Sequence, residues 1–126
     1  IDISYARYVN DTKYDIQYTY QEPKDKTNNV VLSRRPQNRM IGNVTYFFKN
    51  AESVAITTTY ESTRDNSIYD TNQLGSYFLV DVNYLKNIHG YDMGFKINNL
   101  LDKNYRLAHN YNTGGRSFNL SIKSNF

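Results

Sequence analysis

The stretch Phe118-Asn119-Leu120-Ser121-Ile122-Lys123-Ser124-Asn125-Phe126 indicates the fold class more clearly than any other part of the chain. Its residues alternate between apolar and polar side chains. The apolar positions are Phe118, Leu120, Ile122 and Phe126, and only Ser124 interrupts the series. Successive side chains of a β-strand point to opposite faces of its sheet. The stretch therefore predicts a strand with one apolar and one polar face.

The same alternation recurs through the rest of the chain. It is found in residues 14–20, 44–48, 54–60, 78–84 and 91–97. A further strand near residues 1–9 is less regular, because Arg7 follows Ile3 and Tyr5 on the apolar side. We therefore expect about seven antiparallel strands and an all-β fold.

Composition supports this expectation and excludes several protein classes. The 126 residues include 13 Tyr and 6 Phe but no Trp and no Cys. Aromatic residues favour strands, and the absence of cysteine removes disulfides, thiolate catalysis and cysteine metal sites. The chain lacks the run of about 18 apolar residues that a transmembrane helix needs. Its negative mean hydropathy does not argue against transmembrane strands, because only alternate residues of such strands meet lipid.

Short and long connections alternate between the expected strands. The short ones are residues 10–12, 50–52 and 86–90, and the long ones are residues 22–39, 63–76 and 99–116. Outer-membrane β-barrels have short turns on the periplasmic side and long loops outside the cell. The pattern thus predicts an antiparallel transmembrane β-barrel whose long loops lie outside.

Aromatic residues near the strand ends fit the same interpretation. They are Tyr14, Tyr20, Tyr60, Phe78, Tyr84 and Phe126. In membrane barrels such residues form girdles at the two interfaces. A soluble antiparallel sandwich, which also buries one face of each strand, remains an alternative. Another is a soluble module whose exposed tyrosines stack on single-stranded nucleic acid, although the net charge of +3 forms no basic block beyond Arg34-Arg35.

An odd number of strands leaves the predicted barrel incomplete. Bacterial barrels contain an even number, and unpaired strand edges are costly in hydrocarbon. The missing partners must come from additional chain or from other copies. If the irregular first strand is miscounted, six or eight strands could instead form a small barrel.

Two motifs near the end of the sequence resemble the C-terminal barrel region of TonB-dependent outer-membrane receptors. Residues 96–105, K-I-N-N-L-L-D-K-N-Y, look like the family's penultimate strand and its N-L-F-D-K-x-Y motif. Residues 111–118, Y-N-T-G-G-R-S-F, look like Y-x-x-P-G-R-x-F before the last strand. Leu101 replaces the usual Phe, and Gly114 replaces the usual Pro. Phe126 matches the closing aromatic that the barrel-assembly machinery recognises, and Phe118, Leu120 and Ile122 complete that signal.

An upstream motif narrows the resemblance to one branch of the family. Residues 32–38, L-S-R-R-P-Q-N, are similar to the L-x-R-R-P-x-H segment of vitamin B12 receptors. The resemblance implies that residues 1–126 form the last strands of a barrel of about 22 strands. It also implies a plug domain and a TonB box, neither of which is in this chain.

The function that the resemblance implies is TonB-dependent uptake of a scarce large nutrient, most readily cobalamin or another corrinoid. Siderophore and haem receptors of the same family remain alternatives, as does a passive pore or structural barrel. The expected location is the outer membrane of a Gram-negative bacterium. The expected partners are lipid, the rest of the barrel with its plug, TonB and the barrel-assembly machinery, and no nucleic acid.

No arrangement of residues points to catalysis, so we expect neither an enzyme nor a cofactor. His89 is in a short turn and His109 in a long loop, on opposite membrane sides, which argues against a shared metal. Residues 113–116, T-G-G-R, lack the lysine of a phosphate-binding loop. We interpret them as a turn whose glycines permit positive φ.

The candidate ligand-binding residues are basic, aromatic or polar side chains of the long loops. They are Arg34, Arg35, Arg64, Tyr69, Arg106, His109 and Tyr111. Arg34 and Arg35 could also hold an anion or a lipopolysaccharide phosphate through bidentate hydrogen bonds. Four charged residues alternate with apolar ones and are expected to line the lumen: Asp81, Asp92, Lys96 and Lys123.

Overall fold

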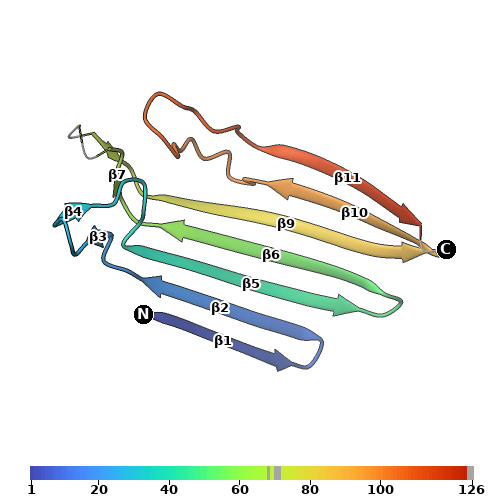
Figure 1. The fold of residues 1–126 in the computed structure, drawn as a ribbon. Coiled ribbons are helices and arrows are strands. Elements are labelled where there is room, and N and C mark those ends of the chain that lie inside the picture. Colours follow the sequence, from blue (N-terminus) through green and yellow to red (C-terminus); the bar gives the residue numbers. More distant parts are fainter. Residues whose placement is uncertain (68, 70–71, 125–126) are drawn as a thin grey trace.

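The computed structural model is one curved layer of antiparallel strands (Figure 1). It describes residues 1–67, 69 and 72–124. Seven long strands form the sheet in sequence order: β1 (Asp2–Val9), β2 (Thr12–Tyr20), β5 (Asn38–Phe48), β6 (Glu52–Glu61), β9 (Tyr77–Ile88), β10 (Tyr91–Asn98) and β11 (Ser117–Ser124). The described residues contain no helix, and hence none that could cross a membrane. The all-β prediction is confirmed, and the sheet is open, with β1 and β11 at its two edges.

The long connections gather at one end of the sheet and the short turns at the other (Figure 1). Two of the long connections carry small hairpins of their own. These are β3 (Lys24–Asp25) with β4 (Val30–Val31), and β7 (Arg64–Asp65) with β8 (Gln73–Leu74). We call the two ends the loop end and the turn end.

Strand pairing gathers most of the apolar side chains of the seven strands on one face. For example, Val44 pairs with Ile56, which pairs with Val82, then Ile97 and Phe118. The apolar face carries the even-numbered residues of β2, β5, β6, β9 and β11 and the odd-numbered residues of β1 and β10. The alternation seen in each separate strand is therefore in phase across the whole sheet.

The opposite face, which we call the polar face, is rich in hydrogen-bonding side chains. One row across it joins Asp15, Asn43, Thr57 and Asp81. Within this row the Thr57 hydroxyl donates to Asn43 Oδ1 at 3.0 Å. The charged residues predicted to share a face do so, because Asp81, Asp92, Lys96 and Lys123 all lie here by register.

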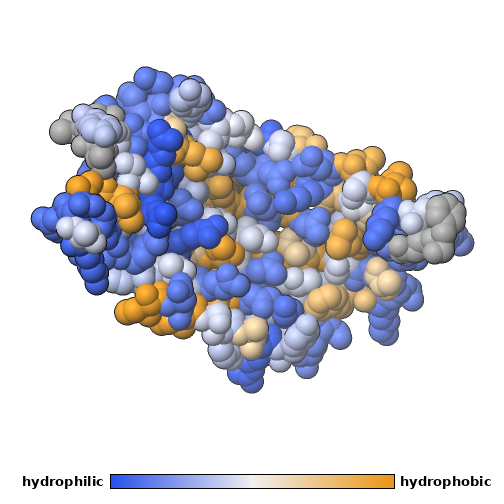
Figure 2. Space-filling model, in the orientation of Figure 1, coloured by the Kyte–Doolittle hydropathy of each residue, from blue (hydrophilic) through white to orange (hydrophobic). Residues whose placement is uncertain are grey.

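Neither face of the sheet encloses a hydrophobic core. Among the described residues only Leu74 and Tyr77 are buried hydrophobics, and both lie at the loop end. Apolar-face side chains are open to the surroundings, with Ile56 46% exposed in the centre and Leu120 72% exposed near one edge. Figure 2 shows hydrophobic side chains at the surface over the strands. Strand pairing, and not core packing, therefore holds the described residues together.

Several predicted boundaries need correction. The expected loop 22–39 ends early, because β5 begins at Asn38 and pairs with Tyr20 of β2. The expected turn 86–90 is only two residues long, because β9 continues to Ile88 opposite Tyr91. Both turn residues, His89 and Gly90, have positive φ, as a tight turn of the type I′ class requires. Pairing with neighbouring strands thus extends β5 and β9 beyond the residues in which apolar and polar side chains alternate.

The role predicted for the glycines of residues 113–116 is wrong. Neither Gly114 nor Gly115 has positive φ, and Gly90 is the only described glycine that does. Gly115 serves close approach instead, since a Cβ there would lie 2.7 Å from Asp102 Oδ1. That carboxylate accepts the main-chain N–H of Arg116 at 2.8 Å. The loop thus enters β11 across a contact that leaves no room for a side chain.

Candidate functional site

The three long loops contact one another at the loop end and form what we call the loop cluster, residues 21–37, 62–67, 72–76 and 99–116. The main-chain N–H of Arg34 in the first loop donates to the carbonyl oxygen of Asp65 in the second at 2.7 Å. Arg64 in the second loop donates to the carbonyl oxygen of Arg106 in the third at 2.8 Å. These bonds join segments that are far apart in the sequence into one structure.

Arg64 lies at the centre of the loop cluster. Its side chain is 1% exposed and forms an ion pair with Glu61 at 3.1 Å. Its guanidinium also lies over the ring of Tyr77, 5.0 Å from the ring centre. Tyr77 in turn packs on Tyr105 with ring centres 4.6 Å apart. Because Tyr77 projects from the polar face of β9, the third loop is anchored over that face.

Two buried asparagines hold other parts of the third loop. Asn66, 7% exposed, accepts the main-chain N–H of His109 on its Oδ1 at 2.8 Å. Asn99, 4% exposed, accepts the N–H of Lys103 at 2.8 Å and donates to the Lys103 carbonyl oxygen at 3.0 Å. Buried polar groups stabilise a structure only when they are hydrogen-bonded. These asparagines meet that condition by fixing the loop backbone.

A pocket of about 750 Å³ opens between the second and third loops. This volume is within the range of about 300–1,000 Å³ that is usual for small-molecule sites. Its lining, which defines the basic pocket, is Gln73, Leu74, Gly75, Ser76, Lys103, Asn104, Tyr105, Arg106, His109, Asn112 and Thr113. Among the described residues the lining includes two cationic side chains and one histidine but no carboxylate.

The basic side chains of this pocket keep their hydrogen-bonding groups available. Lys103 and Arg106 are exposed and His109 is half-buried. None of the three takes part in an ion pair of the described residues. The nearby carboxylates Glu61 and Asp102 are already engaged, by Arg64 and by the N–H of Arg116. The pocket therefore offers positive charge and hydrogen-bond donors together.

The structure separates the predicted ligand-binding residues into three groups. Arg106 and His109 line the basic pocket together. Arg64 is buried and lies outside the lining of the basic pocket, which it supports through its bond to Arg106. It shares the lining of a smaller pocket with Arg35. Tyr69 and Tyr111 are 91% and 74% exposed and lie outside the pocket lining.

Arg34 and Arg35 form the third group, at the other side of the loop cluster. Both are exposed, and Arg34 has a positive φ of 60°. Arg35 lines a smaller pocket of about 220 Å³ with residues of the second loop. The two arginines therefore do not join Arg106 and His109 at one site.

Sequence reasoning missed several pocket residues. Lys103 was visible only as part of a family motif, and Gln73, Ser76 and Asn112 carry no local signal of their own. A cluster of unpaired basic residues in the third loop, Lys103, Arg106 and His109, was the one signal that could have indicated the site. The contribution of residues 73–76 depends on how the second loop folds.

The small hairpin of β3 and β4 is stabilised by Asp25. Its carboxylate accepts hydrogen bonds from the Asn28 side-chain amide at 2.7 Å and from the Thr27 N–H at 2.9 Å. These bonds, that of Asn28 first, lower the pKa of the Asp25 carboxyl group below its usual value. The ionised carboxylate is therefore the form that supports this turn.

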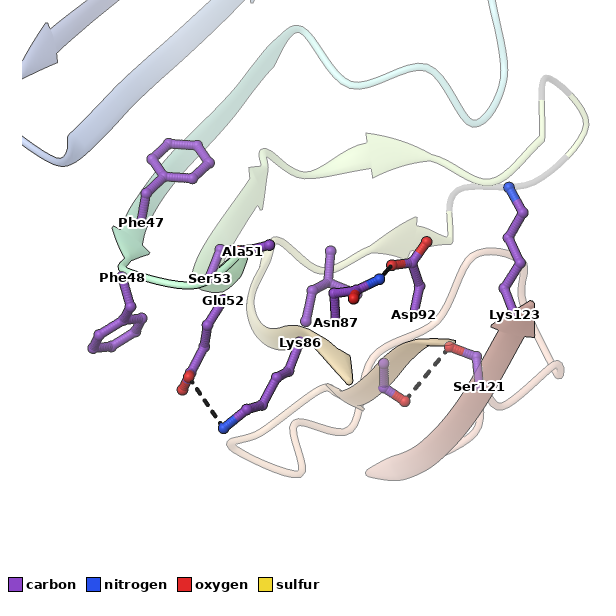
Figure 3. Close-up of a pocket in the computed structure, with 12 residues that line it drawn as sticks. Phe47, Phe48, Ala51, Glu52, Ser53, Lys86, Asn87, Asp92, Ser121 and Lys123 are labelled. Carbon is purple, nitrogen blue, oxygen red and sulfur yellow. Dashed lines mark hydrogen bonds and ion pairs between the residues drawn. The ribbon is translucent and has the colours of Figure 1, made fainter. Parts of the chain in front are cut away.

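A second hollow, of about 570 Å³, lies at the turn end (Figure 3). Phe47 and Leu85 give it apolar walls, and Gly94 leaves space because a Cβ there would lie 2.5 Å from Ser121 Oγ. The Asn87 amide donates to Asp92 at 2.6 Å, and Lys123 lies next to Asp92 on the neighbouring strand (Figure 3). The hollow is more apolar than the basic pocket. It also contains two lysines, but Lys86 pairs with Glu52 at 3.3 Å, and Lys123 is the cross-strand partner of Asp92.

The residues of the predicted assembly signal lie on edge strand β11. Phe118, Leu120 and Ile122 share the apolar face and are 62%, 72% and 63% exposed. Phe126 lies outside the described residues. His89 and His109 lie at opposite ends of the sheet, and the described residues contain no group of three potential metal ligands.

Comparisons with known proteins add no assignment. No protein-family model matches the chain. A search of curated proteins also finds no significant match.

Proposed function

We propose that this chain is a wall segment of a transmembrane β-barrel in the outer membrane of a Gram-negative bacterium. The observation that carries the proposal is the apolar face, which keeps the same phase across seven strands and is covered by no other described element. Its charged residues, Arg7, Glu52 and Lys86, all lie toward the turn end. In water such a continuous apolar surface would be strongly unfavourable. Lipid would cover it, and the polar face would line the lumen.

The dimensions of the sheet support this proposal. Its strands are 8 to 12 residues long, close to the roughly 9–11 residues that a tilted transmembrane strand needs. Aromatic residues occur near both ends of the apolar face: Tyr60 pairs with Phe78 toward the loop end, and Tyr84 pairs with Phe95 toward the turn end. Aromatic rings near both ends of the strands are what the two interfacial girdles of a membrane barrel require.

We further propose that the barrel belongs to a TonB-dependent receptor that takes up a scarce large nutrient, with cobalamin as the first ligand to test. The motifs at residues 32–38, 96–105 and 111–118 support the family. The loop cluster supports a receptor, because it forms an organised pocket at the end of the sheet where the long loops gather. In this function, the plug, TonB and the other strands come from outside this chain.

Nitroxide labels at adjacent positions of β9 test the membrane proposal. The chain contains no cysteine, so Val82→Cys and Asn83→Cys each add one labelling site to it. In lipid bilayers the label at residue 82 should collide with oxygen, which dissolves in lipid. The label at residue 83 should collide with a water-soluble nickel complex. Burial of residue 82 from both reagents in a protein recovered without detergent would refute the proposal and favour a soluble sandwich.

Uptake measurements test the receptor part separately. Cells producing the intact protein should accumulate labelled cobalamin only when TonB is present and the inner membrane is energised. Uptake of an iron chelate or haem under the same dependence would keep the family and change the ligand. Passage of small solutes that continues without TonB would contradict the receptor and favour a passive pore.

A further inference from the structure

We propose that the basic pocket binds a solute through its anionic oxygen atoms, as carboxylate or phosphate groups, with Lys103, Arg106 and His109 as the contacting residues. The inference deepens the proposed function, because it assigns a chemical class to the ligand at the receptor's outer end. The main chains of these residues are held by hydrogen bonds, whereas their side chains line the pocket.

The main chain of each basic residue is held by a different buried polar side chain. Asn99 holds Lys103, Arg64 holds Arg106, and Asn66 holds His109, through hydrogen bonds of 2.8 to 3.0 Å. Arg64, Asn66 and Asn99 are also the three buried polar or charged residues among those described. The buried polar groups of the described chain are thus used to fix the backbone at three basic positions of one pocket.

Fixing the backbone in this way favours binding. A site that is already ordered loses less conformational entropy when its ligand arrives. Two further contacts order the same loop: Tyr105 packs on Tyr77, and the Thr113 hydroxyl donates to the Tyr105 carbonyl oxygen at 2.7 Å. The pocket walls are therefore held without any contribution from a ligand.

The free side chains determine which ligand fits. Within the part of the chain that the structure describes, Lys103 and Arg106 carry positive charge without an ion-pair partner, and no carboxylate lines the pocket. Amide and hydroxyl groups of Asn104, Asn112 and Ser76 supply further donors. Hydrogen bonds from cationic groups to carboxylate or phosphate oxygens are stronger than neutral ones. An anionic, oxygen-rich group therefore suits this lining better than a neutral or cationic one.

Citrate binding to the intact protein, purified in detergent, tests the proposal. Lys103→Gln and Arg106→Gln should each weaken citrate binding about tenfold, since each removes one charge-assisted contact. The matched control is Arg116→Gln, which removes the same charge from the same loop but lies outside the pocket lining. This control should change citrate affinity by less than about twofold, and glucose should not bind detectably.

Two sources of anionic oxygen are possible, and the second arm of the experiment separates them. If the natural group is a lipid phosphate, the wild-type protein should retain lipopolysaccharide phosphorus through purification, and the Lys103→Gln/Arg106→Gln double variant should lose it. Loss of citrate binding alone would identify a dissolved solute. Equal citrate affinity and equal bound phosphorus in the wild type, the double variant and Arg116→Gln would overturn the proposal.

A variant of a residue that holds the loop backbone separates the effect of position from the effect of charge. Asn99→Ala leaves every pocket charge in place but removes both hydrogen bonds to Lys103. It should weaken citrate binding while leaving its salt dependence as in the wild type, whereas Lys103→Gln should reduce that salt dependence. These measurements are independent of membrane location and TonB, so a failure here is distinct from a failure of the proposed function.

Discussion

Arg64 illustrates how one residue links three parts of this protein. A guanidinium group has donors in several directions, and here they reach Glu61 and the Arg106 carbonyl oxygen while the plane lies over Tyr77. An arginine in a long loop is ordinarily solvated, and that is how the sequence alone presents it. Burial changes its role, because an enclosed charge must keep its partners.

Replacing Arg64 should therefore loosen the third loop. Breaking a buried ion pair typically costs about 3–5 kcal/mol, so we expect Arg64→Met to destabilise the local structure by an amount in this range. The measurement is the rate of trypsin cleavage after Lys103 and Arg106, which should rise strongly. Arg35→Met is the control, because Arg35 is exposed, and its cleavage rate should match the wild type. Equal protection of both variants would show that Arg64 does not hold the loop.

At the scale of single elements, the hairpin of β3 and β4 depends on one ionised side chain. The pKa of Asp25 is lowered in the folded hairpin, so its stabilising contribution is present above the usual value of 3.8. That contribution is lost as the pH falls through the lowered folded value. Protonation removes the negative charge that attracts the Asn28 amide and the Thr27 N–H.

Amide hydrogen exchange of residues 24–31 measures this pH dependence. After correction for the intrinsic exchange rate at each pH, protection should decrease below about pH 4 in the wild type. Asp25→Asn should show low protection at every pH, with no such step. A step of the same size in Asp25→Asn would assign the effect to another group.

Lysine substitutions at adjacent residues of β9 test which face of the sheet meets lipid. Val82 lies on the apolar face and Asn83 on the polar face, both near the middle of the strand. In a bilayer, Val82→Lys should lower the free energy of unfolding by about 2–4 kcal/mol, the cost of a lysine at the midplane, whereas Asn83→Lys should have little effect. Denaturant titration in lipid vesicles measures both. Equal losses would contradict the assignment of the faces.

At the scale of the whole molecule, the open edges of the sheet have the largest consequence. Strands β1 and β11 each pair on one side only among the described residues, leaving rows of main-chain N–H and C=O groups available. Such edges favour pairing with further strands. Under the proposed function, those strands come from the rest of a receptor barrel.

The isolated 126-residue chain, refolded in detergent, should therefore associate through its edges. Light scattering should give a protein mass that is a multiple of 14.8 kDa. If the intact protein pairs these edges in a closed barrel, as proposed, it should give the mass of one molecule. A monomeric isolated chain that retains its sheet by circular dichroism would contradict this expectation.

The local sequence determined the strands, and it did so for a physical reason. Alternation with a period of two is a property of the extended backbone, so it is visible in each strand separately. It indicated the last strand at residues 118–126, which the structure describes from Ser117 to Ser124, and the strong alternation within β2, β6 and β9. It was less informative at strand ends, where β5 starts at Asn38 because of pairing with β2.

Only the tertiary structure decided that the apolar positions of all strands fall on the same face. It alone also decided that the basic pocket forms. Register depends on which residue pairs with which across the sheet, and no single strand contains that information. The pocket depends on contacts between distant segments, such as Arg64 with Arg106 and Asn66 with His109, which are 42 and 43 residues apart. The sequence by itself thus determined alternating strands joined by short turns and long loops. Long-range pairing alone decided that their apolar sides form one face and that three basic residues share one pocket.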